Sequence, residues 1–428
     1  MNDAFSEYVR KQFPAMKRKV NGFPAAYLDG PGGYQVPESV IEAVTDYLIN
    51  MNANVGHQFE TAENTSRMIQ NARLIFADFF NCDWEEVIFG ANMTTLNFAL
   101  AQTLARTLRA GDTVLITEID HEANRGPWLQ LKDRGVAVED VAVDAGSCTL
   151  DMEDFREKLA RRPKVVAVNY ASNGVGTIND VREIVRMSHD IGAHTVVDAV
   201  HYAAHGPIDI QELDTDFLLC SAYKFFGPHI GVLYAKKDVL SGLRPFNLRT
   251  QQQCPPFMME TGTLHHEGIA GAASAVEFIA DIGRKFGEKP VGRDGERKAG
   301  RRDRIVAGLK VFEKYEQVLT THLIEAVRSE VPKAAVFGPP EGHPRTSTVS
   351  FTLDGYSAKE VAGYLGSRGL FVWDGHFYAI RLVERLGLLE RGGLVRVGIA
   401  PYNTREELDR LIAALKAEDD LKRYVHRS

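Results

Sequence analysis

The sequence feature that most limits the fold is an alternation of short apolar runs with longer helical runs between residues 86 and 234. The apolar runs are rich in β-branched and aromatic residues, which predicts strands at Val87–Phe89, Thr113–Thr117, Val136–Val141, Lys164–Asn169, His194–Val197, Thr215–Cys220 and Ile230–Tyr234. Alternation of this kind favours a mostly parallel sheet with helices on both faces. We therefore expect an α/β fold that binds ligands beyond the carboxyl ends of its strands.

Three parts of the chain are expected. Residues 1–35 form an N-terminal arm that ends in a turn-rich segment, and residues 36–300 form the large domain. Residues 301–428 begin with a long linking helix and continue as a smaller α+β domain, against which the arm is a candidate to pack. The strands predicted there are Thr346–Leu353, Leu370–Trp373 and Leu394–Gly398.

Charge and cysteine usage exclude several classes of partner. The formal net charge of −7 disfavours nucleic acid and anionic membranes as partners. No apolar run is long enough to span a membrane, and the first residues lack the apolar core of a signal peptide. The four cysteines are widely spaced, which predicts reduced thiols in a cytoplasmic protein. His201 and His205 have the spacing of a zinc pair, but no third ligand is evident, so we expect no metal.

Lys224 is a lysine in an unusual place. It follows an apolar run, has aromatic residues on both sides, and precedes Gly227 and Pro228, which end the segment. Desolvation between a buried strand and an aromatic turn favours the neutral amine, which is the form that makes an imine with a carbonyl group. The alternative is a strand-end lysine that extends its amine to water.

Two further polar residues follow predicted strands. Asp198 ends a wholly apolar run, and a carboxylate there needs a partner, which a pyridinium N–H would supply. The alternative is an aspartate that caps a helix. His121 follows the Thr113–Thr117 run, where an imidazole could stack on a planar ring or could simply be a hydrogen-bonded loop histidine.

Asn92, Met93 and Thr94 lie between a strand and a helix, so their backbone N–H groups could hold an anion or only begin the helix. The chain lacks the G-x-G-x-x-G and P-loop motifs, which disfavours a dinucleotide or ATP. A lysine for an imine, an aspartate for a ring nitrogen, a histidine for the ring face and a helix end for a phosphate together predict pyridoxal 5'-phosphate.

The chain resembles the class V aminotransferase group of fold-type I pyridoxal-phosphate enzymes, in its cysteine-desulfurase-like branch. The matching stretches occur in the family's order at residues 117–124, 172–177, 196–199, 221–224, 262–263, 396 and 402–404. The resemblance implies a large domain with a mostly parallel, seven-stranded type of sheet and a smaller C-terminal α+β domain. It also implies an amino-acid substrate.

The resemblance further implies a role for each matching residue. Lys224 would carry the cofactor, Asp198 would pair with its ring nitrogen and His121 would stack on the ring, while Ser221 would bind the phosphate with Asn92, Met93 or Thr94. Asn173 would approach the ring hydroxyl or the substrate carboxylate, and Arg396 would hold that carboxylate with its bidentate fork. Thr263 would reach the phosphate of the partner subunit, which implies a homodimer with shared active sites.

Three positions differ from the desulfurase pattern. His201 stands where a glutamine commonly bonds the ring hydroxyl, and Tyr223 stands where a histidine commonly precedes the lysine. Tyr378 lies about where desulfurases carry a nucleophilic cysteine, and a phenol cannot accept sulfur as a thiolate does. A carbon–sulfur lyase of the β-elimination type is therefore expected. The alternatives are a class V aminotransferase or epimerase, a true desulfurase that uses another thiol, and a non-catalytic pyridoxal-phosphate-binding protein.

Overall fold

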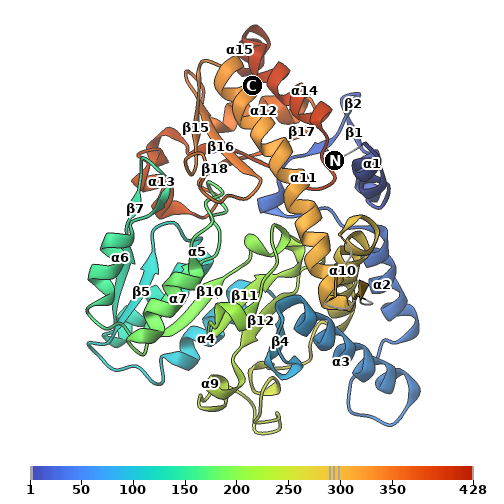
Figure 1. Cartoon of the computed structure of the whole chain (residues 1–428), viewed down its shortest axis with the longest axis vertical. Coiled ribbons are helices and arrows are strands. Elements are labelled where there is room, and N and C mark those ends of the chain that lie inside the picture. Colours follow the sequence, from blue (N-terminus) through green and yellow to red (C-terminus); the bar gives the residue numbers. More distant parts are fainter. Residues whose placement is uncertain (1–2, 289–290, 293–294, 297–298, 427–428) are drawn as a thin grey trace.

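The computed structural model describes residues 3–288, 291–292, 295–296 and 299–426, and its centre is a seven-stranded sheet (Figure 1). In spatial order the strands are β4 (Val87–Gly90), β12 (Gly231–Ala235), β11 (Phe217–Ser221), β10 (His194–Asp198), β9 (Val165–Asn169), β5 (Thr113–Thr117) and β6 (Ala137–Val141). Neighbours from β11 to β6 are parallel, whereas β12 is antiparallel to both β11 and β4. The predicted α/β fold with a mostly parallel sheet is confirmed.

Both faces of the large sheet are buried. Leu218 packs on the face covered by α3 (Glu60–Phe80) and α10 (His266–Phe286), and its neighbour Leu219 packs on the face covered by α4 (Met93–Leu104) and α5 (Glu122–Leu129). This two-residue alternation between two apolar cores explains why the strands are apolar throughout. It also leaves the strand ends as the place where polar side chains collect.

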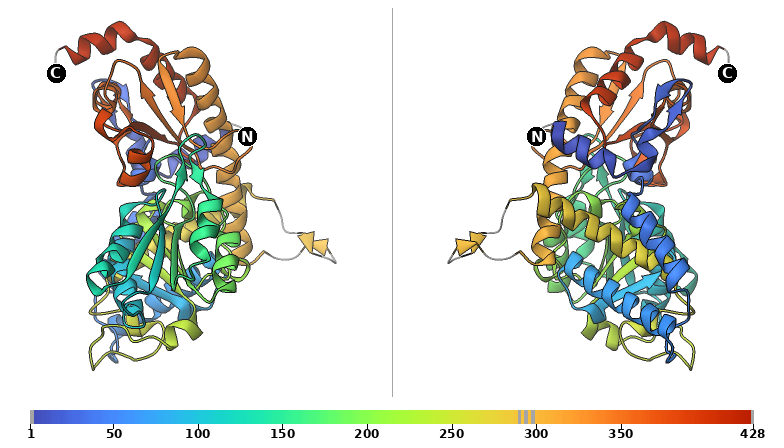
Figure 2. Two further views of the ribbon diagram at one scale, coloured as in Figure 1. Left: turned by 90° about the vertical axis from the view of Figure 1, so that its left-hand side faces the viewer. Right: turned by 90° about the vertical axis from the view of Figure 1, so that its right-hand side faces the viewer.

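A second, four-stranded sheet lies above the large one in the views of Figures 1 and 2. Its antiparallel strands, in spatial order, are β15 (Ala334–Phe337), β16 (Thr348–Leu353), β19 (Leu394–Gly398) and β18 (Trp373–Gly375). The long helix α11 (Arg301–Glu330) runs from the large sheet to the small one (Figure 1). The remaining helices of eight residues or more are α1 (Asp3–Lys11), α2 (Glu38–Asn50), α6 (Met152–Leu159), α7 (Val181–Asp190), α12 (Ala358–Ser367), α14 (Arg405–Lys416) and α15 (Glu418–Val425).

The N-terminal segment is joined to the small sheet and its helices. Strand β3 (Ala26–Tyr27) pairs in parallel with β17 (Leu370–Phe371). In α1, the Arg10 guanidinium donates to the Tyr402 carbonyl at 2.6 Å and to Glu407 at 2.7 Å. Met1 and Asn2 of the predicted arm lie outside the described residues. The division of the chain at residues 35 and 300 stays a prediction.

The sequence prediction differs from the structure in detail at four places. The strand predicted at Leu370–Trp373 is two short strands, because β17 pairs with β3 and β18 pairs with β19. For the segment after β5 the sequence predicts a helix near Trp128–Asp133, but the helix begins at Glu122, where His121 caps it, and its last part is a 3-10 turn. Strand β15 and helix α1 had not been predicted.

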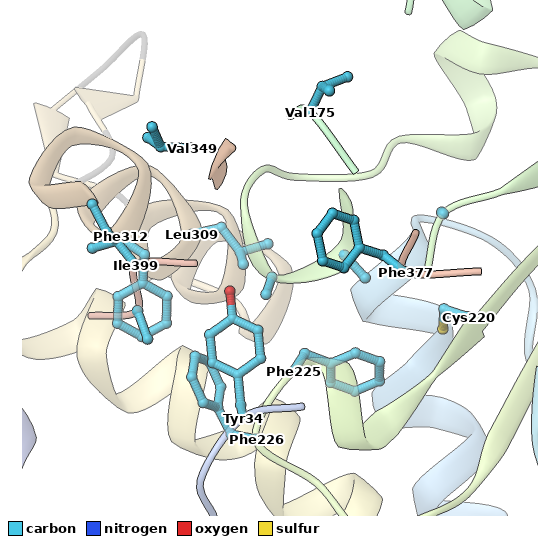
Figure 3. Packing of buried hydrophobic residues seen from close by; sticks show 14 of the residues in the cluster. Tyr34, Val175, Cys220, Phe225, Phe226, Leu309, Phe312, Val349, Phe377 and Ile399 are labelled. Carbon is cyan, nitrogen blue, oxygen red and sulfur yellow. The ribbon is translucent and has the colours of Figure 1, made fainter. Parts of the chain in front are cut away.

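An aromatic cluster joins the turn after β11 to the N-terminal segment and to α11 (Figure 3). The Phe226 ring lies 4.8 Å from the Tyr34 ring and 5.5 Å from the Phe312 ring of α11, measured between centroids. Phe226 has a φ of +70°, a left-handed conformation that a bulky residue keeps only where packing holds it. The backbone beside Lys224 is therefore fixed by tertiary contacts.

Candidate active site

A cavity of about 420 Å³ lies at the carboxyl ends of the large-sheet strands. It is lined by Pro31, Asn92, Met93, Thr94, His121, Ala123, Asn169, Ala171, Asn173, Asp198, Val200, His201, Ser221, Tyr223, Lys224 and His229. Every site residue predicted from the sequence except Arg396 and Thr263 lines this cavity. Residues far apart in the chain meet here because parallel strands end on the same edge.

Lys224 lies in a 3-10 turn, Ala222–Lys224, directly after β11. Its Nζ donates to the Pro31 carbonyl oxygen and lies 4.7 Å from the centroid of the Tyr223 ring. Burial and the nearby Arg396 charge lower the pKa of the Lys224 amine to about 7. Near neutral pH a large fraction of this amine is therefore unprotonated, and it can act as a nucleophile or a base.

Asp198 ends β10 and is 5% exposed. Its Oδ1 accepts a hydrogen bond from the Val200 backbone N–H at 2.9 Å, and no cation of the described chain forms an ion pair with it. Burial raises the pKa of the Asp198 carboxyl to about 7. A buried carboxyl without a cationic partner fits a protonated ring nitrogen, which would supply the missing charge.

The N-terminus of α4 forms the anion-binding end of the cavity. The Met93 N–H donates to Ser221 Oγ at 3.0 Å, and Asn92 Oδ1 caps the helix by accepting from the Thr95 N–H at 2.9 Å. In the described chain the Thr94 N–H has no acceptor. A Cβ at Gly231 would lie 2.4 Å from the Asn92 carbonyl carbon, so only glycine lets β12 pass this close. This end fits a phosphate.

His121 caps α5, with Nδ1 accepting from the Ala123 N–H at 2.9 Å. Burial and the charges of Lys224 and Arg396 lower the pKa of the imidazole to about 4. The ring is therefore neutral near pH 7 and carries its proton on Nε2. The neighbouring ring is Tyr378, at a centroid distance of 5.4 Å.

His201 and Asn173 lie at the border between the two sheets. His201 Nε2 is 3.0 Å from both the Thr346 and the Thr348 hydroxyl oxygens, and burial holds its pKa well below the usual value. Asn173 Nδ2 donates to the Phe377 carbonyl at 2.9 Å, while its Oδ1 is buried without a partner. An unpaired buried acceptor facing this region fits a site that is completed by a ligand.

Arg396, in β19, is buried beside the cavity and does not line it. Its Nη2 donates to Asp29 Oδ1 at 2.8 Å, its Nη1 donates to the Asn173 carbonyl at 3.1 Å, and its Nε is buried without a partner. The guanidinium carbon lies 4.5 Å from the centroid of the Phe377 ring, which Figure 3 shows next to the aromatic cluster. Asp29 and Phe377 carry no direct signal in the sequence, although Asp29 lies in the turn-rich segment that ends the N-terminal arm.

Thr263 lies in a different pocket, of about 580 Å³, together with Gly262, Gln251 and the buried ion pair of Arg73 with Glu260. Within one subunit it does not meet Lys224 or Ser221. The role predicted for Thr263 therefore requires a second subunit.

The loop between β18 and the short helix α13 (Ile380–Arg385) carries Tyr378, whose ring neighbours that of His121 in the cavity wall. Phe377 and Tyr378 are both left-handed, with φ of +54° and +57°. The Tyr378 carbonyl accepts from the Glu122 N–H at 2.8 Å, and its N–H donates to His376 Nδ1 at 3.1 Å. The backbone of this loop is thus held in a strained conformation beside His121, a feature common at functional sites.

None of the four cysteines lines the cavity. Burial raises the pKa of the thiols of Cys82, Cys148 and Cys220, and Cys254 is exposed in the segment before Thr263. Among the described residues no group of side chains has the composition of a metal site. In the same part of the chain no helix has the length and apolar character of a membrane span.

Comparison with known proteins gives consistent matches. The family model for aminotransferase class V matches residues 26–291 and 306–411. The chain is 32% identical to a cysteine desulfurase of Pectobacterium carotovorum, with 96% of this chain and 97% of the relative covered. It is 33% identical to the aminotransferase-like protein FGM3 of Gibberella zeae, with the same coverage. The apo structure of a cysteine desulfurase from Thermococcus onnurineus superposes with a TM-score of 0.84 at 26% identity, covering 96% of this chain and 97% of that one.

Proposed function

The chain belongs to the class V aminotransferase family of pyridoxal-phosphate-dependent enzymes, and we propose that it is a carbon–sulfur lyase acting by β-elimination on a sulfur-bearing amino acid. With L-cysteine the balanced reaction consumes one water and yields pyruvate, ammonia and hydrogen sulfide. With an S-substituted cysteine the sulfur leaves as the corresponding thiol. A cytoplasmic location and the predicted roles of the individual site residues are also proposals.

The observation that carries this proposal is the absence of a thiol among the side chains that line the described cavity. Tyr378, whose ring lies 5.4 Å from that of the cavity-lining His121, is about where the resemblance places the sulfur-accepting cysteine. A phenol is a poor acceptor of sulfur because it is neutral near pH 7. Sulfur released from a substrate is therefore expected to leave as a free product.

The cofactor, when bound, supplies a carbonyl for the substrate amine and a ring that withdraws electrons from the substrate Cα. Lys224 binds the cofactor and then acts as the base that removes the Cα proton, which suits an amine with a pKa of about 7. Arg396 binds the substrate α-carboxylate. The Arg396 Nε–H supports this assignment, because it is a buried donor without an acceptor and could bond a carboxylate oxygen.

The other site residues hold the cofactor in place. Asp198 is assigned to the ring nitrogen, and the α4 N-terminus with Asn92, Met93 and Thr94 is assigned to the phosphate together with Ser221. His121 is assigned to the ring face as a neutral imidazole, and His201 is assigned to the ring hydroxyl. Fixed donors of this kind stabilise charge without rearranging during the reaction.

We also propose a homodimer in which Thr263 completes the phosphate site of the partner subunit. Exposed apolar side chains support an interface near this segment: Ile49 is 72% exposed, Phe246 is 64% exposed and Leu248 is 57% exposed. Thr263 and Leu248 line the same pocket. Such an interface would bury these side chains and bring Thr263 to a second active site.

One alternative has a specific observation in its favour. Cys254 is exposed, and it lies nine positions before Thr263 in the segment assigned to the interface (263 − 254 = 9). In a dimer this thiol could serve a neighbouring site, which would make the protein a desulfurase with a relocated sulfur acceptor. The two functions differ in their carbon product, since a desulfurase releases alanine.

The test is to incubate the pyridoxal-phosphate-loaded protein with L-cysteine, L-cystine and S-substituted cysteines and to identify the carbon product. We expect pyruvate and ammonia in equal amounts, with the same result for Cys254→Ser. Alanine as the main product, lost in Cys254→Ser, would establish the alternative. Conversion to the D-enantiomer, or a requirement for an oxo-acid acceptor, would establish an epimerase or an aminotransferase.

A further inference from the structure

The Arg396 guanidinium is sealed from the cavity that it is proposed to serve. Its side chain is 3% exposed, while the Asp29 side chain that pairs with it is 22% exposed. The Phe377 ring covers the guanidinium, with 4.5 Å between the guanidinium carbon and the ring centroid. The Arg396 Nε is buried from solvent and has no hydrogen-bond partner. A carboxylate from outside can form a bidentate pair with Arg396 only after one of these neighbours has moved.

Backbone contacts hold the main chain of Asp29 in place, and its side chain forms the ion pair with Arg396. The side chain can therefore leave Arg396 without any movement of the backbone. The Asp29 backbone forms a parallel bridge with Gly398, two residues after Arg396, and the Gly398 N–H donates to the Leu28 carbonyl at 2.8 Å. A Cβ at Gly32 would lie 2.0 Å from Asp29 Oδ2, so the carboxylate folds back against Gly32 and would have to shift if this residue carried a side chain. The pair is thus built into the fold and does not depend on a flexible surface contact.

The same segment also holds the proposed imine-forming lysine. The Pro31 carbonyl accepts the hydrogen bond from Lys224 Nζ, two residues after Asp29. Asp29 is close enough to Lys224 to raise the pKa of its amine against the lowering effect of Arg396. One short turn therefore contacts both groups that the substrate is proposed to engage.

We propose that Asp29 is a displaceable internal carboxylate, which occupies Arg396 until the α-carboxylate of the substrate takes its place. This inference rests on the proposed function of Arg396 as the carboxylate site. The exchange replaces one carboxylate by another, so the buried guanidinium never loses its counter-ion. An amine that lacks a carboxylate cannot release Arg396, which makes Asp29 a determinant of specificity for amino acids.

This arrangement has a thermodynamic consequence. A carboxylate ligand binds only those molecules in which Arg396 is free, so its apparent affinity falls in proportion as that fraction becomes smaller. Removing the Asp29 carboxylate makes Arg396 free in all molecules and restores the full affinity. Neutralising Asp29 is therefore expected to tighten the binding of a carboxylate. If Asp29 merely positioned Arg396, neutralising it would weaken the same binding, so the two roles predict opposite signs.

The experiment is a calorimetric titration of the cofactor-loaded protein with propionate, which has a carboxylate but no amine, and with the neutral propionamide as control ligand. For Asp29→Asn we expect propionate to bind about tenfold more tightly, with propionamide unchanged. Gly32→Ala keeps the carboxyl group but displaces it, so a smaller increase in propionate affinity is expected. This second variant decides the question if Asp29→Asn does not fold.

Arg396→Gln separates the two proposals, since it should abolish propionate binding. If it does so while Asp29→Asn and Gly32→Ala bind propionate as the wild type does or more weakly, the role of Asp29 is overturned and the role of Arg396 stands. If Arg396→Gln leaves propionate binding unchanged, the carboxylate role of Arg396 is wrong, and with it the displacement by Asp29.

Discussion

The two ends of the active-site cavity are built in different ways. At the end near Asp198 and Ser221, the side chains come from strand ends of the large sheet and face the cavity with unfilled hydrogen-bonding capacity. At the other end, Arg396 of the small sheet is buried and paired with Asp29 of the N-terminal segment. Under the proposed roles, the first end can receive the cofactor as it stands, whereas the second must rearrange to receive a substrate.

The first end holds the residues assigned to the cofactor, and the second holds the residues assigned to the substrate and to the choice of product. The cofactor end has the residue types that the family's cofactor requires, each fixed by a strand or a helix terminus. The substrate end holds the departures: a tyrosine in place of the expected cysteine, two left-handed residues in succession and an internal carboxylate. Substitutions at the two ends are therefore expected to change different observables.

The largest effect is expected for Lys224→Ala, because it removes the only lysine that lines the described cavity. We expect the visible absorbance of the bound cofactor to disappear and the rate of product formation to fall by roughly 10³-fold or more. Lys236→Ala, at a partly exposed lysine paired with Asp214, is the control and should behave as the wild type. If the absorbance persisted in Lys224→Ala, the assignment of Lys224 as the residue that binds the cofactor would be wrong.

Asp198→Asn tests whether the buried carboxyl acts on the cofactor ring. We expect the cofactor to bind but kcat to fall on the order of 10²-fold, since a neutral amide no longer balances a ring charge. The absorbance spectrum should shift in the loaded variant. Asp190→Asn, at an exposed carboxylate, is the matched control. A kcat within twofold of the wild type in Asp198→Asn would contradict the assigned role.

The low pKa of Lys224 predicts the pH dependence of cofactor loading. The free amine is the reacting form and predominates above its pKa, which burial lowers to about 7. In cofactor-free protein, the loading rate should rise about tenfold per pH unit below 7 and level off above about 8. Stopped-flow absorbance between pH 5 and 10 measures this profile. A rate that keeps rising to pH 10 would show an ordinary, solvated lysine.

The smallest effect is expected for Tyr378→Phe. The loop is held through backbone groups of Tyr378, and this residue is 60% exposed, so removal of the hydroxyl leaves these contacts intact. We expect kcat/KM to change by less than about threefold and the products to stay the same. Loss of activity by more than about tenfold would mean that the phenol takes part in the reaction. Residues of both ends would then contribute to the chemical step.

The sequence sufficed to predict that Asp198 and Lys224 meet in one cavity, because both stand at the ends of apolar strands, where polar residues are conspicuous. It did not suffice for the substrate end, where Asp29 meets Arg396 across 367 positions of sequence. Such a pair depends on the joining of β3 to β17, two strands of two residues each. Likewise, the helix start at Glu122 was not predicted, because α5 contains Pro127 and a proline normally marks the start or end of a helix. In the structure His121 caps this helix start.

The most direct test of the central claim follows the sulfur atom. Cofactor-loaded protein is mixed with a limiting amount of L-cysteine for a single turnover, and sulfide in solution and the intact mass of the protein are measured together. We predict that all of the sulfur appears as free sulfide and that the protein mass is unchanged. A protein heavier by one sulfur atom, with alanine as the carbon product, would contradict the account.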